Sequence, residues 1–259
     1  MTLHTHNQSI YTYLAPVYDD VMKGVDYEVW ADFIDSIIAE HFEEAQTVLE
    51  LGCGTGTLSL LLDELDLYDI TATDISAEML EVARFKADFA KSGIRFEQVD
   101  FTDIRLEERF DVALLVYDGI NYMTDPDGVL RVLGQVRQVL QPDGIFILDF
   151  ATFVNSQRNS ELMNDEGITP DRWRYVRVSR FLPAERLHYN EFTLEQLAEA
   201  SDTVLLRHRE VHVQRVYTLE EMRGFCLRSG FRILAAYSGS ELEDATSQSD
   251  RVTLVLQAE

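Results

Sequence analysis

Residues 48–56 read Val48-Leu49-Glu50-Leu51-Gly52-Cys53-Gly54-Thr55-Gly56, a short apolar run that leads into three glycines at alternate positions. Glycine is needed in such a turn because a Cβ atom would block positive φ angles or collide with a closely bound ligand. When a helix starts directly after the turn, its free backbone N–H groups and positive end face that ligand. The stretch therefore predicts a buried strand, a ligand-binding turn and a helix.

Short apolar runs recur after this turn, and amphipathic stretches separate most of them. The runs cover residues 69–74, 94–100, 110–118, 144–150, 231–238 and 251–257. Strands that alternate with helices usually form a parallel sheet with helices on its faces. We therefore predict an α/β protein of the Rossmann-like kind, with a mostly parallel seven-stranded sheet.

Two segments stand outside this alternation. Apolar residues recur at helical spacing near the start of the chain, with a kink predicted at Pro16, so we predict a helical cover over residues 1–45. Three strand-like runs within residues 171–217 predict an antiparallel β insertion. The sheet domain then consists of residues 46–153 and 218–259.

The composition excludes several classes of function. The chain has 259 residues and a formal net charge of −24, from 22 basic and 46 acidic side chains. This charge repels the phosphates of nucleic acids and anionic membranes, so we expect neither as a partner. No apolar run approaches the ~20 residues of a membrane helix and no secretory signal is evident, so we expect a cytoplasmic protein. Cys53 and Cys226 lie far apart, and we expect neither a disulfide nor a metal site.

Acidic side chains end the two predicted strands that follow the glycine turn. Asp74 lies 22 residues beyond Gly52, where a carboxylate suits the two hydroxyls of an adenosine ribose. Asp100 and Phe101 end the next strand, where a carboxylate and an aromatic ring suit the amino group and the face of adenine. Ligands of open α/β sheets bind at the carboxyl ends of the strands, where all these groups fall. The sequence therefore predicts a cofactor that contains adenosine.

The spacing of the glycines distinguishes between such cofactors. A dinucleotide site has the pattern Gly-x-Gly-x-x-Gly, whereas here the third glycine is Gly56 and Thr57 follows it. The chain also lacks a Ser-Tyr-Lys set for hydride transfer. An NAD-dependent oxidoreductase is therefore the less favoured interpretation.

Together these motifs resemble the class I S-adenosylmethionine-dependent methyltransferases, a family with a Rossmann-like fold. The resemblance rests on Glu50-Leu-Gly-Cys-Gly-Thr-Gly56, Asp74-Ile-Ser-Ala-Glu-Met79-Leu, Asp100-Phe-Thr-Asp and Phe110-Asp-Val-Ala-Leu-Leu-Val. Four further motifs resemble small bacterial methyltransferases of unassigned substrate, relatives of the amino-sugar N,N-dimethyltransferases. These motifs are Val17-Tyr18-Asp19, Gly24-Val-Asp-Tyr27-x-x-Trp30, Tyr117-Asp118-Gly-Ile-Asn121-Tyr122 and His212-Val-Gln-Arg215-Val-Tyr217.

The resemblance implies a role for each matching residue. The cofactor-binding set is Glu50, Gly52, Cys53, Gly54 and Gly56 around the methionine part, Asp74 at the ribose, Ile75 or Met79 against adenine, and Asp100 and Phe101 at the base. Tyr18 and Tyr117 would border the sulfonium, because aromatic faces suit a cation. The insertion would be a substrate cover or the contact between the subunits of a homodimer.

The catalytic residues are harder to identify, because methyl transfer from a sulfonium needs alignment and exclusion of water rather than a nucleophilic side chain. The residues considered for a general base are Asp118, Tyr117, His188 and His212, of which Tyr117 and His212 rank first. Tyr18 completes the predicted catalytic set. Because His212 alternates with Val211 and Val213, simple packing on a strand is the alternative for it.

Four arginines lie on the first predicted strand of the insertion: Arg172, Arg174, Arg177 and Arg180. Their favoured interpretation is a solvated strand face. Recognition of an acidic or phosphorylated small substrate is the alternative.

The sequence as a whole predicts in-line methyl transfer from S-adenosylmethionine to a nitrogen or oxygen atom of a small-molecule acceptor. One alternative is a regulatory or scaffold protein that binds S-adenosylmethionine without turnover. The other, less favoured, is the NAD-dependent oxidoreductase. Cofactor binding without turnover on any acceptor would indicate the scaffold, whereas NAD binding would indicate the oxidoreductase.

Overall fold

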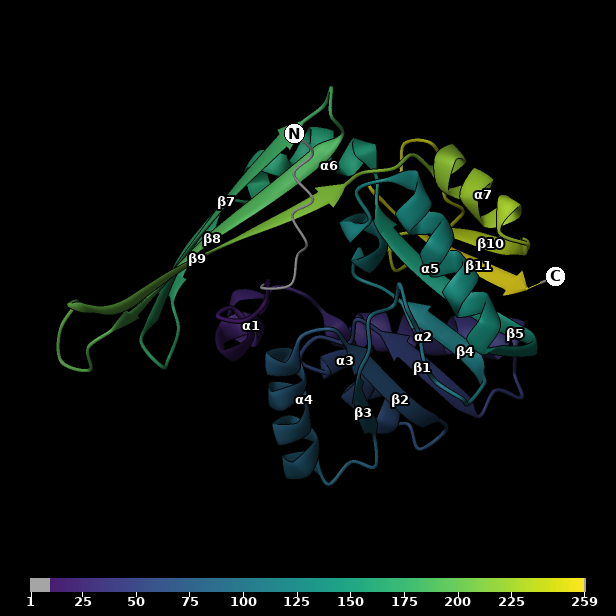
Figure 1. The fold of residues 1–259 in the computed structure, drawn as a ribbon, viewed down its shortest axis with the longest axis horizontal. Coiled ribbons are helices and arrows are strands. Elements are labelled where there is room, and N and C mark those ends of the chain that lie inside the picture. Colours follow the sequence, from purple (N-terminus) through teal and green to yellow (C-terminus); the bar gives the residue numbers. More distant parts are fainter. Residues whose placement is uncertain (1–9, 259) are drawn as a thin grey trace.

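The structure, a computed structural model, describes residues 10–258. Its main layer is a seven-stranded sheet with the strand order β10-β11-β5-β4-β1-β2-β3 (Figure 1). The strands are β1 (Thr47–Leu51), β2 (Asp69–Asp74), β3 (Arg95–Gln98), β4 (Phe110–Leu115), β5 (Leu140–Ala151), β10 (Phe231–Ser238) and β11 (Arg251–Ala258). The strand β11 runs antiparallel to both of its neighbours, β10 and β5, and the other strand pairs of this sheet are parallel. The predicted mostly parallel, seven-stranded sheet is confirmed.

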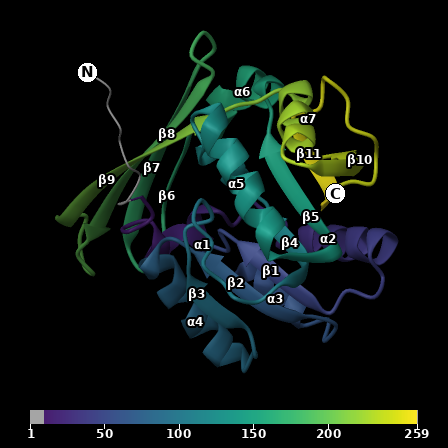
Figure 2. The same ribbon diagram turned by 45° about the vertical axis from the view of Figure 1, so that its right-hand side comes forward.

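Helices cover both faces of the sheet (Figure 2). They are α2 (Tyr27–His41), α3 (Thr57–Asp63), α4 (Ala77–Ala90), α5 (Pro126–Val139) and α7 (Leu219–Arg228). Side chains of α5 and α7 pack with Leu49 in one core, whereas α2, α3 and α4 contribute to a second core with Val48. Neighbouring residues of a strand point to opposite faces, so β1 is buried on both sides.

Side chains of the types that commonly cap helices begin three of these helices: Ser76 before α4, Asp125 before α5 and Thr218 before α7. The Ser76 hydroxyl accepts a hydrogen bond from the backbone N–H of Met79 at 3.1 Å. Thr218 and Glu221 form a reciprocal capping box at the start of α7. Gly230, with φ of +76°, follows the end of the same helix. These local signals position the ends of the helices.

The N-terminal cover is more broken than its apolar pattern predicts. In its described part, the 3-10 turn η1 (Ala15–Val17) leads into the short helix α1 (Tyr18–Val21). Pro16 lies within the 3-10 turn rather than at a kink in a longer helix. Residues 1–9 of the predicted cover lie outside the described residues. Between residues 10 and 258, no helix combines the length and apolar character needed to cross a membrane.

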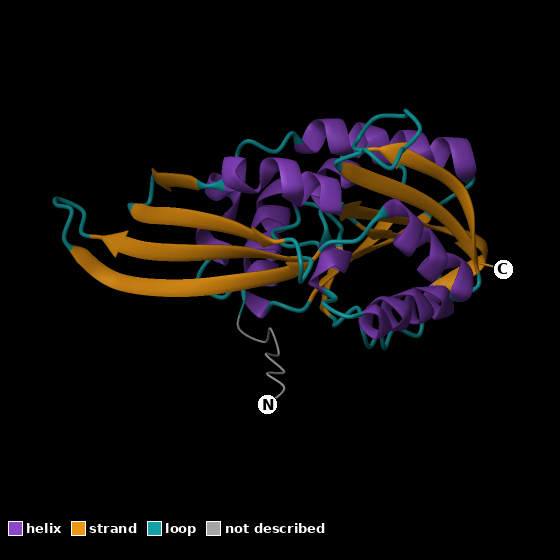
Figure 3. Ribbon diagram, turned by 90° about the horizontal axis from the view of Figure 1, so that it is seen from above, coloured by secondary structure: helices purple, strands orange, loops and turns teal. Residues whose placement is uncertain are grey.

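A second sheet of four antiparallel strands projects from the first (Figure 3). Its strands, in spatial order, are β6 (Asp165–Ile168), β7 (Trp173–Leu182), β8 (Leu187–Leu197) and β9 (Val204–Arg215), and α6 (Phe153–Asn159) and η3 (Ser160–Met163) lead into it. The last three strands are the predicted runs, whereas β6 was not predicted. Tyr175 and Phe192 of this sheet pack with Leu14 and Val17 of the cover in a third apolar core.

Candidate active site

The glycine turn lies at the carboxyl end of β1 and leads into α3. Gly52, Gly54 and Gly56 all have positive φ, and a Cβ on Gly56 would lie 3.0 Å from the Cβ of Ala83 in α4. At Gly54, nothing lies within 4 Å of the corresponding Cβ position. Cys53 is buried in the core beneath the turn. The turn therefore lets α4 approach on one side and leaves space for a ligand at Gly54.

Two buried carboxylates flank the turn. Asp74, at the end of β2, is 8% exposed and accepts hydrogen bonds from the backbone N–H groups of Gly54 at 2.9 Å and Ser76 at 2.8 Å. Glu50, in β1, is 2% exposed and accepts a hydrogen bond from the hydroxyl of Ser59. Burial raises the pKa of both carboxyl groups, that of Glu50 to about 7. These acids suit the hydroxyl and ammonium donors of a ligand.

The other predicted cofactor residues lie at varying depth around the turn. Ile75 is 45% exposed, whereas Met79 is 1% exposed within α4. The ring of Phe101 lies 3.9 Å from the Cβ position of Gly52 and therefore borders the turn. Asp100 is exposed and accepts hydrogen bonds from the residue two positions later. Of this group, Phe101 lies beside the turn and Met79 is covered by the core.

The N-terminal cover contacts the turn directly. In α1, the carboxylate of Asp19 accepts a hydrogen bond from the Thr55 hydroxyl at 2.5 Å and pairs with the Lys86 ammonium of α4 at 2.8 Å. The adjacent Tyr18 has its ring 5.9 Å from that of Tyr11. Burial raises the pKa of both phenols well above the usual range, so both are neutral at physiological pH. The structure thus places Tyr18 against Tyr11, next in sequence to a residue that bonds to the glycine turn.

Tyr117 follows β4 and packs against α2. It has φ of +52°, and its ring lies 4.9 Å from that of Trp30 and 5.2 Å from that of Tyr27. Its hydroxyl is buried and has no hydrogen-bond partner within residues 10–258. An unpaired buried hydroxyl costs about 1–3 kcal/mol, which a ligand that bonds to it would recover.

Asp118 is held in an ion-paired triad. Arg251, at the start of β11, bonds to Asp118 and to Asp149 at the end of β5, and Gln214 bonds to Asp118 at 3.0 Å. Burial raises the pKa of Asp149 to about 6 despite the guanidinium. Burial also opposes ionisation of Asp118, but Arg251 and Gln214 outweigh it and lower its pKa. Asp118 is therefore a poor proton acceptor.

His188, in β8, is buried between α6 and β7. It is 3% exposed, and its two ring nitrogens each lie 2.7 Å from a serine hydroxyl, those of Ser156 and Ser179. Burial lowers the pKa of the imidazole. With both nitrogens occupied, His188 has no free atom for a substrate.

His212, in β9, is connected to the cover by a chain of hydrogen bonds. Its Nδ1 lies 2.9 Å from the Tyr122 hydroxyl, which lies 2.6 Å from the Tyr11 hydroxyl. Its Nε2 lies 3.4 Å from the Glu210 carboxylate. Sequence reasoning missed Tyr11 and Tyr122, and the only signal was the place of Tyr122 in the quoted motif after β4. The structure brings these residues together because β9, the segment after β4 and the cover meet here.

The arginines in and just before β7 have partners on the insertion itself. Arg172 pairs with Asp202, Arg174 pairs with Glu195, Arg177 bonds to Asn190, and Arg180 lies over the ring of Tyr189. These contacts support the favoured interpretation of a solvated, internally paired face.

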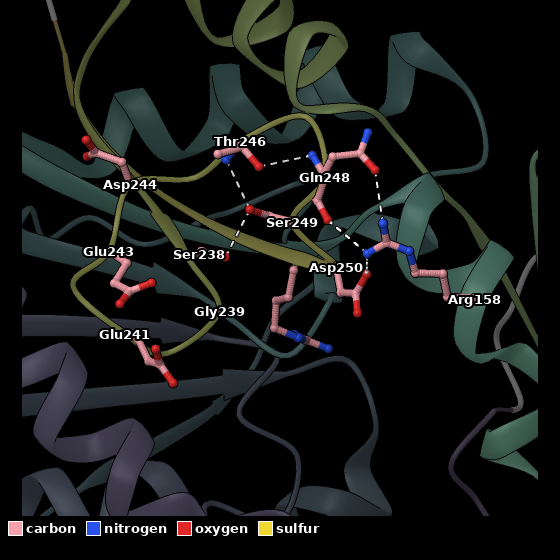
Figure 4. Close-up of a pocket in the computed structure, with 11 residues that line it drawn as sticks. Arg158, Ser238, Gly239, Glu241, Glu243, Asp244, Thr246, Gln248, Ser249 and Asp250 are labelled. Carbon is pink, nitrogen blue, oxygen red and sulfur yellow. Dashed lines mark hydrogen bonds and ion pairs between the residues drawn. The ribbon is translucent and has the colours of Figure 1, made fainter.

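A polar hollow of about 490 Å³ lies farther along the carboxyl edge of the sheet (Figure 4). The loop between β10 and β11 forms most of its wall, with Arg158 and Asp250 joined across one side at 3.1 Å. Arg251, which also bonds to Asp118, borders it. None of the predicted site residues lines this hollow.

The groups at the turn fit S-adenosylmethionine. The open position at Gly54 admits a ligand against the backbone, and the buried carboxylates of Glu50 and Asp74 suit its ammonium and ribose hydroxyl groups. Aromatic faces such as those of Tyr18 and Tyr117 suit a sulfonium.

Comparison with known proteins finds a methyltransferase domain in the chain. Residues 48–144 match the family described as methyltransferase domain. The chain is 24% identical over 239 residues to a putative methyltransferase of Geobacillus sp. (strain WCH70), covering 92% of this chain and 95% of the relative. It is 24% identical over 237 residues to dTDP-4-amino-2,3,4,6-tetradeoxy-D-glucose N,N-dimethyltransferase of Saccharopolyspora spinosa, covering 89% of this chain and 84% of the relative.

A solved structure has the same fold. The S-adenosylmethionine-dependent methyltransferase from Clostridium acetobutylicum superposes with a TM-score of 0.80 at 23% identity, covering 96% of this chain and 98% of the other. The fold, the glycine turn with its two buried acids and the matching domain all indicate a methyltransferase. Residues 48–144 thus form a methyltransferase domain, and the chain has the fold of an S-adenosylmethionine-dependent methyltransferase.

Proposed function

We propose that the enzyme methylates a nitrogen or oxygen atom of a small-molecule acceptor. The observation that carries this proposal is the buried contact between the insertion and the cover, which also bonds to the glycine turn through Asp19. There His212 is 2% exposed and bonds to Tyr122, which in turn bonds to Tyr11 of the cover. A site closed in this way excludes water and suits a small acceptor.

An amine is the favoured acceptor. The similarity to an amino-sugar N,N-dimethyltransferase extends over 89% of this chain. The proposal also agrees with the net charge of −24, which disfavours nucleic acid as the acceptor.

The residues around the turn would act mainly by binding and orientation. When bound, S-adenosylmethionine supplies a methyl group on a positively charged sulfur. Glu50 and Asp74 would bind its polar groups, and Tyr18 and Tyr117 would border the sulfur. Phe101 would flank the base. Held in this way, the methyl carbon would face the acceptor in line with its bond to sulfur.

We infer that His212 holds the proton that an amine acceptor releases. With Tyr122 donating to Nδ1, the N–H at Nε2 faces Glu210. The amine proton would pass to the Tyr11 oxygen as Tyr11 gives its own proton to Tyr122 and Tyr122 gives its own to Nδ1, which would form an imidazolium beside the Glu210 carboxylate. The carboxylate would stabilise that charge.

We also propose a role and a setting for the whole chain. Residues 1–45 would cover the cofactor, and residues 171–217 would cover the acceptor or form a homodimer contact. The proposed location is the cytoplasm, and the proposed assembly is a homodimer. Light scattering during size-exclusion chromatography tests the homodimer, because it gives the mass of the protein in solution. A single chain has a mass of 29.7 kDa, and a homodimer has twice that mass.

The first experiment is calorimetric titration with S-adenosylmethionine, S-adenosylhomocysteine and NAD. We expect saturable binding of the two sulfur nucleotides and none of NAD. Transfer of labelled methyl groups to a panel of amino sugars, simple amines, sugar hydroxyls and RNA then tests the acceptor class. Labelled amines support the proposal, whereas labelled RNA contradicts it. Binding without transfer to any acceptor favours the scaffold alternative.

A further inference from the structure

One face of β9 contacts the N-terminal cover through three alternate residues. His208 stacks on Tyr13 with ring centroids 3.5 Å apart, and the ring of His212 meets that of Tyr11 at 4.6 Å. Glu210 lies between the two histidines on the same face, because side chains of a strand alternate in direction. The cover is therefore attached to the insertion by polar and aromatic contacts as well as by its apolar core.

Glu210 makes the most concentrated of these contacts. One of its carboxylate oxygens accepts a hydrogen bond from the backbone N–H of Tyr11 at 2.8 Å. The other accepts from the N–H groups of Tyr13 at 2.6 Å and Leu14 at 3.2 Å. These N–H groups precede η1, at the start of a helical turn, where the first N–H groups lack partners within the turn itself. Glu210 thus caps the cover from a segment about 200 residues away in sequence.

The carboxyl group of Glu210 is charged in this position. It is 5% exposed, and burial alone would favour its neutral form. His212 and the N–H groups of Tyr13 and Tyr11 outweigh burial and lower its pKa. Hydrogen bonds to an ionised acceptor are stronger than those between neutral groups. Three such bonds to one carboxylate hold the cover firmly at this end.

The other end of the same segment is attached to the cofactor turn. Asp19 bonds to Thr55 of the turn and to Lys86 of α4. With the cover in this position, Glu50, Thr55 and Asp74 are no more than 8% exposed. The cover thus lies against the turn at Asp19, so movement of the cover changes the surroundings of a ligand there. The contacts of Glu210 are among those that such a movement must break.

We propose that Glu210 is a positioning residue by which the insertion holds the cover closed over the cofactor. The insertion then controls exchange of the cofactor as well as access of the acceptor. This inference rests on the proposed function, because it takes the glycine turn to be the cofactor site. Its primary test uses the ligand-free protein and does not depend on that assumption.

The test compares Glu210→Gln with Glu191→Gln as a matched control. Glu191, in β8, pairs with Arg209 at 2.6 Å on the surface of the insertion. Amide hydrogen exchange of Tyr11, Tyr13 and Leu14 is measured by NMR without ligand. Stopped-flow fluorescence gives the association and dissociation rate constants of S-adenosylhomocysteine.

We expect Glu210→Gln to accelerate exchange at the three amides by about tenfold or more, the effect of losing one charge-assisted hydrogen bond. Association and dissociation of S-adenosylhomocysteine should both become faster by a similar factor. The control should leave all three measurements unchanged. A general loss of stability would lower the melting temperature without accelerating association, so this split distinguishes a positioning role from a merely structural one.

Unchanged amide exchange in Glu210→Gln would overturn the inference, as would unchanged rate constants in both directions. If Glu210→Gln does not fold, Glu210→Asp keeps the charge but shortens its reach, and we expect an intermediate acceleration. Wild-type exchange rates in that folded variant would likewise overturn the inference. Failure of the wild type to bind S-adenosylhomocysteine would reject the proposed function instead, and amide exchange would still decide whether Glu210 holds the cover.

Discussion

Glu50 makes the stability of the protein depend on pH. Burial raises the pKa of its carboxyl group from the ordinary 4.5 to about 7. Between these values the folded state binds more protons than the unfolded state, so the free energy of unfolding falls as pH rises. A shift of this size corresponds to about 3 kcal/mol, at about 1.36 kcal/mol for each pKa unit. We expect that loss between about pH 4.5 and about pH 7.

Urea unfolding of the wild type and of Glu50→Gln across this range measures the effect. The amide cannot ionise, so the difference between the two proteins isolates Glu50 from other titrating groups. We expect the wild type to lose stability relative to the variant as pH rises. A difference that is independent of pH would show that Glu50 titrates normally.

Asp74 is the single side chain on which cofactor affinity should depend most. Replacing Asp74 with Ala removes the ribose acceptor and also the partner of the N–H groups of Gly54 and Ser76. We expect the dissociation constant of S-adenosylhomocysteine to rise roughly a hundredfold, equivalent to about 3 kcal/mol. Calorimetry measures this change. Asp69→Ala, at the exposed opposite end of β2, is the control and should bind normally.

Between elements, the hydrogen-bonded chain from β9 to the cover should affect turnover more than binding. His212→Gln keeps a polar side chain but removes the imidazole that accepts a hydrogen bond from Tyr122 in the proposed tautomer. We expect kcat on an accepted amine to fall about a hundredfold, the usual range for loss of a general base. The affinity for S-adenosylhomocysteine should change little. Unchanged turnover would exclude His212 as the proton acceptor.

The capping box of α7 is a second prediction at the scale of elements. Thr218→Ala removes the acceptor for the backbone N–H of Glu221 at 3.2 Å. Loss of a helix N-cap costs about 1 kcal/mol, and we expect that decrease in the free energy of unfolding in urea. Thr203→Ala, in the exposed loop after β8, should change stability by less than about 0.5 kcal/mol.

For the whole molecule, cofactor binding should stabilise the closed arrangement of sheet domain, cover and insertion. S-adenosylhomocysteine at about a hundred times its dissociation constant adds about 2.7 kcal/mol to the free energy of unfolding. A chain of this size should then melt roughly 5–10 °C higher. Thermal melts with increasing ligand measure the shift. NAD should produce no shift, and an equal shift with NAD would favour the oxidoreductase alternative.

Much of the fold follows from short-range patterns. Residues 48–56 predict β1 and its turn, and Ser76 and Thr218 predict the starts of two helices. The strand β6 was not predicted, because its four residues are too few to show the two-residue hydrophobic alternation of a strand. The predicted N-terminal helix is instead a 3-10 turn and one turn of α-helix, because packing against the insertion sheet determines the shape of the cover.

The sequence by itself determined the alternating α/β fold, the glycine turn and the acids that follow it, because neighbouring residues carry those signals. Only the tertiary structure decided the surroundings of His212. Tyr122 and Glu210 meet there although 88 residues separate them in sequence, and Tyr11 lies farther still from Glu210. No periodicity connects such residues, because their contacts arise from the packing of two sheets and the cover. The same reason explains why Glu210, a strand residue in a polar run, was not recognised as a partner of the cover.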